Sequence, residues 1–369
     1  MRVENQSVSG ESKPASGRRI FRGCIAAGVA VAASSMLLLA ACGSDGGGSG
    51  GQAGASSELV VRTGVVAEGY DVPAFYAEKM GYFEDEGLDV EVLQGAGSAG
   101  NVKLVGTGKA DFGVVDLSAA ATAKKQGMPV KAIGAVFHKT PLATIVLDSS
   151  EIKSPEDLKG HQIGETPESS TSRFFPAYLD ALGMTPSDIK SVTMGAAGQP
   201  QALVSERIDA FNSYALEQVP LVEIALETPA RAFEWGDYLT MLGLGIVANS
   251  DAIEQDPEVM KKFMRAYAKG YVESMKNPEE GAQAILDKYP RAGGGSLETI
   301  VRQWELSQEL QYTDSTDGKP LFWMSEEDWN GTIDTLNKYA DGEIDAPASD
   351  FYTNDLIADV TKPPAPPAS

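Results

Sequence analysis

The side chains that most often carry catalysis are scarce in this chain. Its 369 residues include two cysteines, Cys24 and Cys42, and two histidines, His138 and His161. No set of residues has the spacing of a metal site, and no Walker sequence is present. Residues 95–100 match a dinucleotide fingerprint only in part, because no glycine occupies the last place of the pattern. We therefore predict a binding protein and no enzyme, with no cofactor and no metal.

Polar side chains suited to binding lie instead where strands are expected to end. The predicted ligand-binding residues are Glu68, Tyr70, Asp71, Ser98, Asn101, Asp116, His138, Ser170, Thr171, Asn212, Tyr214 and Glu217, with Ser169 and Gln199 beside them. Most loop residues bind nothing, so each has an alternative role. Ser98 and Ser170 could be helix caps, and Asn212 a turn residue. Glu217 could lie on a solvated helix face, and His138 in an exposed turn.

A repeating pattern in the first third of the chain should position these residues. Apolar and β-branched runs at residues 59–66, 88–92 and 112–116 predict strands. Helices are expected from Val72-Pro73 and after residues 95–101. The order β-α-β-α-β is typical of an α/β protein with a parallel sheet. Open sheets of this kind bind ligands at the carboxyl ends of their strands, where the candidates lie.

Three segments resemble a known family of proteins. Residues 76–91 (YAEKMGYFEDEGLDVE) resemble the segment after the first strand in solute-binding proteins of ABC importers for sulfonates, nitrate and thiamine-pyrimidine precursors. Residues 108–113 (GKADFG) are similar to the next signature of that family, and residues 351–356 to its usual ending. The resemblance covers about residues 58–358 and implies the two-lobed type 2 periplasmic-binding-protein fold. That fold has two mixed sheets flanked by helices, with a ligand cleft between the lobes.

The resemblance also implies a division of the chain. We expect a lipoprotein signal peptide at 1–42, a flexible Gly/Ser tether at 43–57, lobe 1 at 58–145 plus 240–358, lobe 2 at 146–239, and a disordered Pro-rich tail at 359–369. The apolar runs 142–147 and 239–247 are the expected crossings between lobes, and closure of the lobes should hinge there.

The N-terminus has the features of an export signal. A basic flank precedes an apolar stretch too short for a transmembrane helix. Residues 39–42 (LAAC) resemble the bacterial lipoprotein cleavage box, so Cys42 would become the lipidated first residue; small residues before a cysteine can also arise by chance. Residues 18–22 also resemble a twin-arginine signal. We expect an exported protein, anchored by lipid on the extracytoplasmic face of the cell membrane.

The charged residues exclude some classes of partner and favour one class of ligand. The net charge of −22 argues against nucleic acid. Two predicted helix N-termini, at 95–101 and 169–172, would suit an anionic ligand. The acids near the predicted cleft are Glu68, Asp71, Asp116, Glu165 and Glu217, against His138, Lys139 and Arg173 as cations. This excess of acids favours a neutral or weakly basic, pyrimidine-like ring over an alkyl sulfonate.

The sequence therefore predicts a monomeric, lipid-anchored solute-binding component of an ABC importer that closes on a small nutrient and delivers it to a membrane permease. Residues 214–217 (YALE) faintly resemble the aromatic-to-glutamate spacing of the pyrimidine-precursor binders. One alternative is a binder of sulfonate, taurine or nitrate. Another is an enzyme of thiamine-pyrimidine biosynthesis on the same fold, and a third is a purely structural surface lipoprotein.

Overall fold

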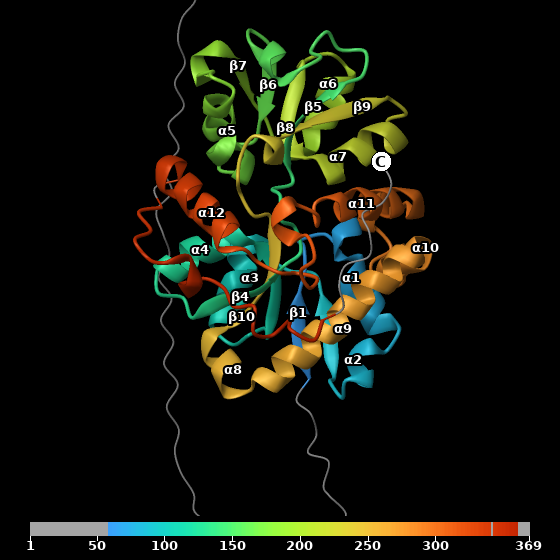
Figure 1. Cartoon of the computed structure of the whole chain (residues 1–369). Coiled ribbons are helices and arrows are strands. Elements are labelled where there is room, and N and C mark those ends of the chain that lie inside the picture. Colours follow the sequence, from blue (N-terminus) through green and yellow to red (C-terminus); the bar gives the residue numbers. More distant parts are fainter. Residues whose placement is uncertain (1–57, 341, 361–369) are drawn as a thin grey trace, which may run out of the picture. The chain divides into compact units, whose positions relative to one another are not determined.

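A computed structural model describes residues 58–340 and 342–360 of the chain. Cys42, the predicted signal peptide and the predicted tether lie outside the described residues, as does most of the predicted tail. Two five-stranded sheets with helices around them make up the described part (Figure 1).

The first sheet is built on the predicted β-α-β-α-β unit. Its strand order is β2-β1-β3-β10-β4. The strands are β1 (Leu59–Arg62), β2 (Val90–Leu93), β3 (Phe112–Asp116), β4 (Val130–Ala135) and β10 (Leu244–Asn249). Strand β1 runs parallel to β2 and β3, whereas β10 is antiparallel to β3 and β4. The parallel unit is confirmed, and the late strand β10, inserted between β3 and β4, makes the sheet mixed.

The second sheet repeats this arrangement in the order β7-β6-β8-β5-β9. Its strands are β5 (Leu142–Leu147), β6 (Gln162–Glu165), β7 (Lys190–Thr193), β8 (Ala210–Tyr214) and β9 (Ala230–Glu234). Strand β6 is parallel to β7 and β8, and β5 is antiparallel to β8 and β9. The predicted fold class, two mixed sheets flanked by helices, is confirmed.

Helices lie around both sheets (Figure 1). They are α1 (Val72–Lys79), α2 (Tyr82–Asp85), α3 (Gly97–Gly106), α4 (Leu117–Lys125), α5 (Ser170–Ala181), α6 (Gln199–Val204), α7 (Ala215–Pro220), α8 (Ser250–Gln255), α9 (Pro257–Lys276), α10 (Pro278–Lys288), α11 (Leu297–Glu309) and α12 (Glu326–Tyr339). Within the described residues, no helix combines the length and the apolarity needed to cross a membrane.

Aromatic stacking holds the long helix α9 on the first sheet. Phe263 of α9 stacks on Phe112 of β3 with ring centroids 3.6 Å apart, and on Phe83 of α2 at 5.3 Å. All three rings are at most 2% exposed. Burying an aromatic side chain of this size contributes about 2–3 kcal/mol to stability. The three rings therefore hold α9 and α2 against strand β3 of the first sheet.

The chain passes between the sheets in two short segments. Strand β4 ends at Ala135 in the first sheet and β5 begins at Leu142 in the second. The return runs from the end of β9 at Glu234 to the start of β10 at Leu244. Residues 142–147, expected to be a crossing, instead pair along their length with β8 and β9, because their apolar side chains belong to a central strand. The division of the chain into lobes stays a proposal, with the crossings moved to 136–141 and 235–243.

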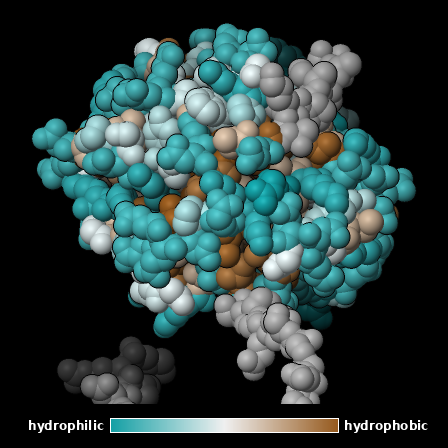
Figure 2. All heavy atoms as spheres, turned by 60° about the horizontal axis from the view of Figure 1, so that its bottom comes forward, coloured by the Kyte–Doolittle hydropathy of each residue, from teal (hydrophilic) through white to brown (hydrophobic). Residues whose placement is uncertain are grey.

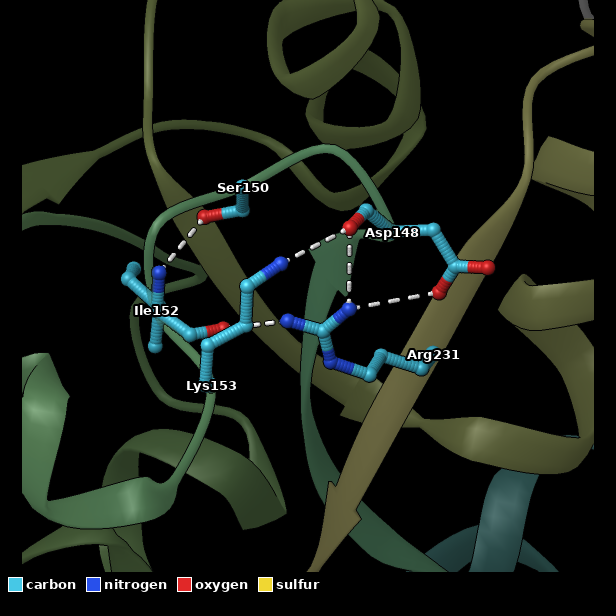
Figure 3. Close-up of polar contacts among 5 residues, drawn as sticks. All are labelled: Asp148, Ser150, Ile152, Lys153 and Arg231. Carbon is cyan, nitrogen blue, oxygen red and sulfur yellow. Dashed lines mark hydrogen bonds and ion pairs between the residues drawn. The ribbon is translucent and has the colours of Figure 1, made fainter.

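A polar network fixes the end of β5 that points away from the first sheet (Figure 3). The guanidinium of Arg231 on β9 donates to the carbonyl oxygen of Asp148 at 3.1 Å and to that of Ile152, and it pairs with the Asp148 carboxylate at 3.4 Å. Lys153 donates to the Asp148 carbonyl oxygen at 3.2 Å, and the Ser150 hydroxyl accepts from the Ile152 N–H at 3.2 Å. Here a carboxylate at the surface has a direct cationic partner.

One face of the described body is largely hydrophilic around a smaller hydrophobic area (Figure 2). A predominantly hydrophilic surface is consistent with the strongly negative net charge.

Candidate functional site

A cavity of about 520 Å³ lies between the ends of the two sheets. Its walls come from the loop after β1, the N-terminus of α3, the end of β3, the N-terminus of α5, and the junction of β8 with α7. Among the predicted ligand-binding residues it is lined by Glu68, Tyr70, Ser98, Asn101, Asp116, Ser170, Tyr214 and Glu217. A cavity of this volume suits a small organic molecule.

The local sequence explains why side chains from the first sheet reach this place. Strand β1 ends at Arg62, and a short 3-10 helix, η1 (Gly69–Asp71), turns the chain into α1, where Pro73 occupies a first-turn position. Strand β3 runs parallel to β1 and ends at Asp116. Both loops therefore open at the same edge of the sheet, as expected for the carboxyl ends of parallel strands.

Three carboxyl groups form an acidic cluster on and behind the cavity wall. Glu68 and Glu217 line the cavity, and Asp71 lies fully buried behind it, accepting the Glu68 N–H at 3.1 Å. Burial raises the pKa of Glu68 to about 7, although a hydrogen bond from Gln303 opposes the shift. Burial also raises the pKa of Asp71 to about 8 and that of Glu217 to about 8. Each of the two also feels the negative charge of Glu68.

Tyr70 connects this cluster across the cavity. Its side chain hydrogen-bonds Glu217 of α7, which belongs to the second half of the fold. Its ring meets the edge of Phe137 at a centroid distance of 6.2 Å. Burial, followed by the charges of Glu217 and Asp71, raises the pKa of the Tyr70 phenol, so the phenol stays a hydrogen-bond donor.

Asp116 is a helix cap that keeps one oxygen free. Its Oδ1 accepts from the backbone N–H of Ser118 at 2.8 Å and from the Ser118 hydroxyl. Asp116 thereby caps the N-terminus of α4. Its Oδ2 is buried and has no hydrogen-bond partner. Ser98 accepts the Asp116 N–H at 2.9 Å. Burial raises the pKa of Asp116, although the hydrogen bonds from Ser118 and, less strongly, the charge of Arg173 oppose the shift.

Asn101 lines the cavity, but its amide is engaged by the backbone. Its Oδ1 accepts the Ala96 N–H at 2.9 Å, and its Nδ2 donates to the Thr63 carbonyl at 2.7 Å and to the Val114 carbonyl at 3.3 Å. Gly95 makes this possible, since a Cβ there would stand 2.3 Å from the Asn101 Oδ1. Asn101 therefore positions the loops of the site by joining the ends of β1 and β3.

Two predicted site residues lie in a neighbouring pocket of the second half. Thr171 and Asn212 line a pocket of about 230 Å³ that shares Ser170, Tyr214 and Glu217 with the cavity. Thr171 is held by a 2.8 Å hydrogen bond between its hydroxyl and that of Ser169. Asn212 is 2% exposed.

His138 is the predicted site residue that the structure places elsewhere. It is 4% exposed and is absent from the walls of both pockets. Its Nε2 lies against the Trp323 carbonyl oxygen, and its Nδ1 lies 3.1 Å from the Gln311 side chain. Burial lowers its pKa. His138 is thus neither a cleft residue nor an exposed turn residue, because the chain turns inward after β4.

One positioning residue carried no sequence signal. Gln303 of α11 accepts the Gly69 N–H at 2.9 Å through its Oε1 and also hydrogen-bonds the Glu68 carboxyl. It lies 234 positions from Gly69, so no local pattern could have found it. Lys139, counted among the cations, pairs instead with Asp237 at 3.0 Å outside the cavity. Arg173 does line the cavity, as an exposed side chain.

The walls therefore combine carboxyl groups with the side chains of Tyr70 and Tyr214. Carboxyl groups with a pKa near 7 or 8 can accept N–H groups of a ligand when ionised, and they can exchange protons near neutral pH. Within residues 58–340 and 342–360, no group of three or more side chains could hold a metal ion.

Comparison with known proteins gives this arrangement a family context. The sequence model of the family described as NMT1/THI5 like matches residues 69–281, which include most of the cavity wall.

Two curated relatives match over most of their length. One is the 4-amino-5-hydroxymethyl-2-methylpyrimidine phosphate synthase of Legionella pneumophila, 26% identical over 79% of this chain and 89% of its own. The other is the riboflavin-binding protein RibY of Chloroflexus aurantiacus, 26% identical over 77% of this chain and 82% of its own.

A solved structure supports the fold. The periplasmic aliphatic sulphonate binding protein SsuA of Escherichia coli superposes with a TM-score of 0.63, at 14% identity, over 85% of this chain and 95% of its own. At this identity the likeness shows the fold and leaves the ligand open.

The relatives correct one sequence-based prediction. Several of them bear the name of a pyrimidine phosphate synthase, which is the name of an enzyme. The prediction of no enzyme is therefore wrong. It relied on the scarcity of histidine and cysteine and left out carboxyl groups whose pKa burial brings close to neutral pH.

Proposed function

The chain belongs to the NMT1/THI5-like family, and on that premise we propose that it is the extracytoplasmic solute-binding component of an ABC importer for a pyrimidine-like heteroaromatic nutrient. The observation that carries the proposal is the acidic cluster of Glu68, Asp71 and Glu217 at a cavity between two lobes. A ring with N–H groups supplies hydrogen-bond donors to these carboxyl groups in their ionised form.

The shape of the interaction follows from the residues on the wall. The amino group of the ring donates to Glu68 or Glu217, and Tyr70 and Tyr214 offer faces for stacking. The ligand touches elements of both halves, so it favours a closed arrangement of the lobes by its differential affinity for that state. RibY, a relative named for binding riboflavin, is itself a binder of a nitrogen-rich aromatic ligand.

A sulfonate or nitrate ligand fits these walls less well. An anion beside Glu68, Glu217 and Asp116 would either keep those groups protonated or meet their charge. An uncompensated buried charge costs several kcal/mol. The exposed guanidinium of Arg173 offers limited compensation, because solvent screens exposed charges.

Synthesis of a pyrimidine is the second candidate function. The names of the relatives favour it, and so does the protonation state of the site. Glu68, with a pKa of about 7, and Glu217, with a pKa of about 8, can each give or take a proton at neutral pH.

We further propose that Cys42 carries a lipid anchor on the extracytoplasmic face of the membrane and that a permease receives the ligand. The support is the cleavage-box sequence at 39–42 and the Gly/Ser-rich stretch after it. Cys42→Ala should move the protein from the membrane fraction to the soluble fraction. Unchanged membrane retention of this variant would argue against the anchor.

Mass spectrometry of the protein purified without refolding tests the function. We expect one aminopyrimidine per chain. Recovery of a sulfonate would contradict the proposed ligand class. Conversion of an added precursor into a pyrimidine, lost in Glu217→Gln, would favour the synthase over the receptor.

A further inference from the structure

Two residues that line the pocket beside the cavity have buried side-chain donors for which residues 58–340 and 342–360 offer no hydrogen-bond partner. The amide nitrogens Gln199 Nε2 and Asn212 Nδ2 are both buried and have no hydrogen-bond partner. Gln199 is 1% exposed and Asn212 is 2% exposed, and both line the pocket of about 230 Å³. A buried donor without a partner costs about 1–3 kcal/mol, so two in one pocket are a substantial destabilisation at a single place.

A relay of hydrogen bonds fixes which way the Asn212 amide points. The Trp235 indole Nε1, which can only donate, gives its proton to the Thr144 hydroxyl oxygen at 3.1 Å. The Thr144 hydroxyl then donates its own proton to Asn212 Oδ1 at 2.8 Å. Because Oδ1 is the acceptor in this relay, Nδ2 is the end of the amide that is left without a partner. Thr144 and Trp235 are fully buried, so the orientation is set before any ligand arrives.

The surroundings of the two amides suit an oxygen atom. The Thr166 hydroxyl also lines the pocket, buried and without a partner, and the pocket lies at the N-terminus of α5. Glu217 lines the same pocket and carries negative charge once ionised. A neutral acceptor oxygen meets the donors without facing that charge, whereas an anion would face it.

We propose that this pocket is a subsite for a neutral acceptor oxygen, such as a hydroxyl or carbonyl, on a substituent of the ligand. Glu217, Tyr214 and Ser170 line both pockets, so one molecule can place its ring in the cavity and its substituent here. The two parts of the site then have opposite roles. Carboxylates of the cavity accept hydrogen bonds from N–H groups of the ligand, and amides of the subsite donate hydrogen bonds to its oxygen. This assignment rests on the proposed function, because it extends a ring ligand from the same cavity.

Calorimetry with two ligands that differ in one oxygen tests the subsite. We expect 4-amino-5-hydroxymethyl-2-methylpyrimidine to bind about tenfold more tightly than 4-amino-2,5-dimethylpyrimidine, the value of one or two satisfied donors. Gln199→Glu replaces the donor by an acceptor of the same shape, and it should reduce this ratio to about one. The matched control is Gln201→Glu, on the same helix α6 but exposed, which should keep the tenfold ratio. An unaltered ratio in Gln199→Glu would overturn the subsite.

NMR of the wild-type protein is a second test, and it does not depend on whether a variant folds. The side-chain NH₂ resonances of Gln199 and Asn212 should shift when the hydroxymethyl compound is added and stay in place with the dimethyl compound. Equal shifts with both compounds, or none with either while both bind, would overturn the subsite. If neither pyrimidine bound, the proposed function would fail separately. Riboflavin, a neutral ring compound with carbonyl and hydroxyl oxygens, would then be the probe, and unmoved NH₂ resonances at riboflavin saturation, or no riboflavin binding, would overturn the subsite as well.

Discussion

The carboxyl groups of the cavity and those on the outer helices of the first sheet have opposite surroundings. Directly after α2, Glu86 accepts from the Arg265 guanidinium at 2.6 Å in a two-point contact with α9. At the cavity, no ion pair to Glu68, Asp71 or Glu217 occurs within the part of the chain that the structure describes. The carboxylate that joins two outer helices is thus paired with a cation, whereas the three carboxyl groups at the cavity are not paired with one in the described residues.

The difference shows which groups of the site lower the stability of the empty protein. Burial without a cation raises the pKa values of the cluster to about 7 and 8, which means that ionised forms are disfavoured there by the protein alone. A ligand that donates N–H groups offsets this cost only when bound. A binding site that is destabilising when empty and satisfied when full is a common compromise between stability and function.

The largest expected effect concerns the pH dependence of stability. Between pH 4.5 and 8 the folded protein holds protons on these carboxyl groups that the unfolded chain has lost, so the free energy of unfolding falls as pH rises. Glu217→Gln removes one such group. The free energy of unfolding of the variant, relative to that of the wild type, should therefore rise by roughly 1 kcal/mol per pH unit between pH 4.5 and 8.

Urea unfolding of both proteins at pH 5 and pH 8 measures this gain. Glu227→Gln, an exposed change in the same half of the fold, is the control and should leave the profile unaltered. Parallel pH profiles for Glu217→Gln and the wild type would show that Glu217 is not titrating in this range.

The same variant should lose affinity for the ligand. Replacing the carboxylate by an amide removes a charge-assisted acceptor for the ring amino group, worth about 2 kcal/mol or roughly 30-fold in Kd. Titration calorimetry with the hydroxymethyl pyrimidine measures it. Glu217→Gln would thus be more stable and bind less tightly, whereas a variant that binds as well as the wild type would remove Glu217 from the site.

Breaking the paired carboxylate should have the opposite pattern. Glu86→Gln disrupts the contact with Arg265, and the partly exposed pair should contribute about 1 kcal/mol or less to the free energy of unfolding. Ligand affinity should not change, since the pair lies on the outer helices. A change in affinity above threefold would contradict the separation of the two acidic environments.

The smallest effect is expected at the far end of the second sheet. Arg231→Gln removes the ion pair with Asp148, whose side chain is about half exposed, and should cost about 0.5 kcal/mol. Thermal unfolding measures the loss, and ligand binding serves as the internal control. A loss of several kcal/mol would mean that the carbonyl contacts of the Arg231 guanidinium, rather than the ion pair, hold the loop in place.

Local patterns predicted the frame of the molecule well. The strand alternation and the Pro73 helix start depend on neighbours in sequence, and they led to the first sheet and to the strand ends at Glu68 and Asp116. Contacts between distant segments were invisible. Gln303 reaches Glu68 from α11, and His138 is buried against Trp323, far along the chain. Both depend on how segments after β10 pack, which no local spacing records.

The roles of some residues were also beyond the sequence. Asn101 on α3 and Asn212 on β8 carry the same side-chain amide. The Asn101 amide is consumed by backbone groups, whereas the Asn212 nitrogen is left unpartnered in a pocket. Only the hydrogen-bond partners of each amide separate a positioning residue from a candidate ligand contact.

The central claim is that the acidic cluster selects an N–H-bearing ring over an anion, and paired calorimetric titrations at pH 7 test it most directly. We expect 4-amino-5-hydroxymethyl-2-methylpyrimidine to bind one to one with a micromolar or lower Kd, and taurine to bind about 100-fold more weakly or not at all, a difference of about 2.7 kcal/mol. Micromolar binding of taurine, with none for the pyrimidine, would contradict the account and assign recognition to the helix N-termini at the cavity.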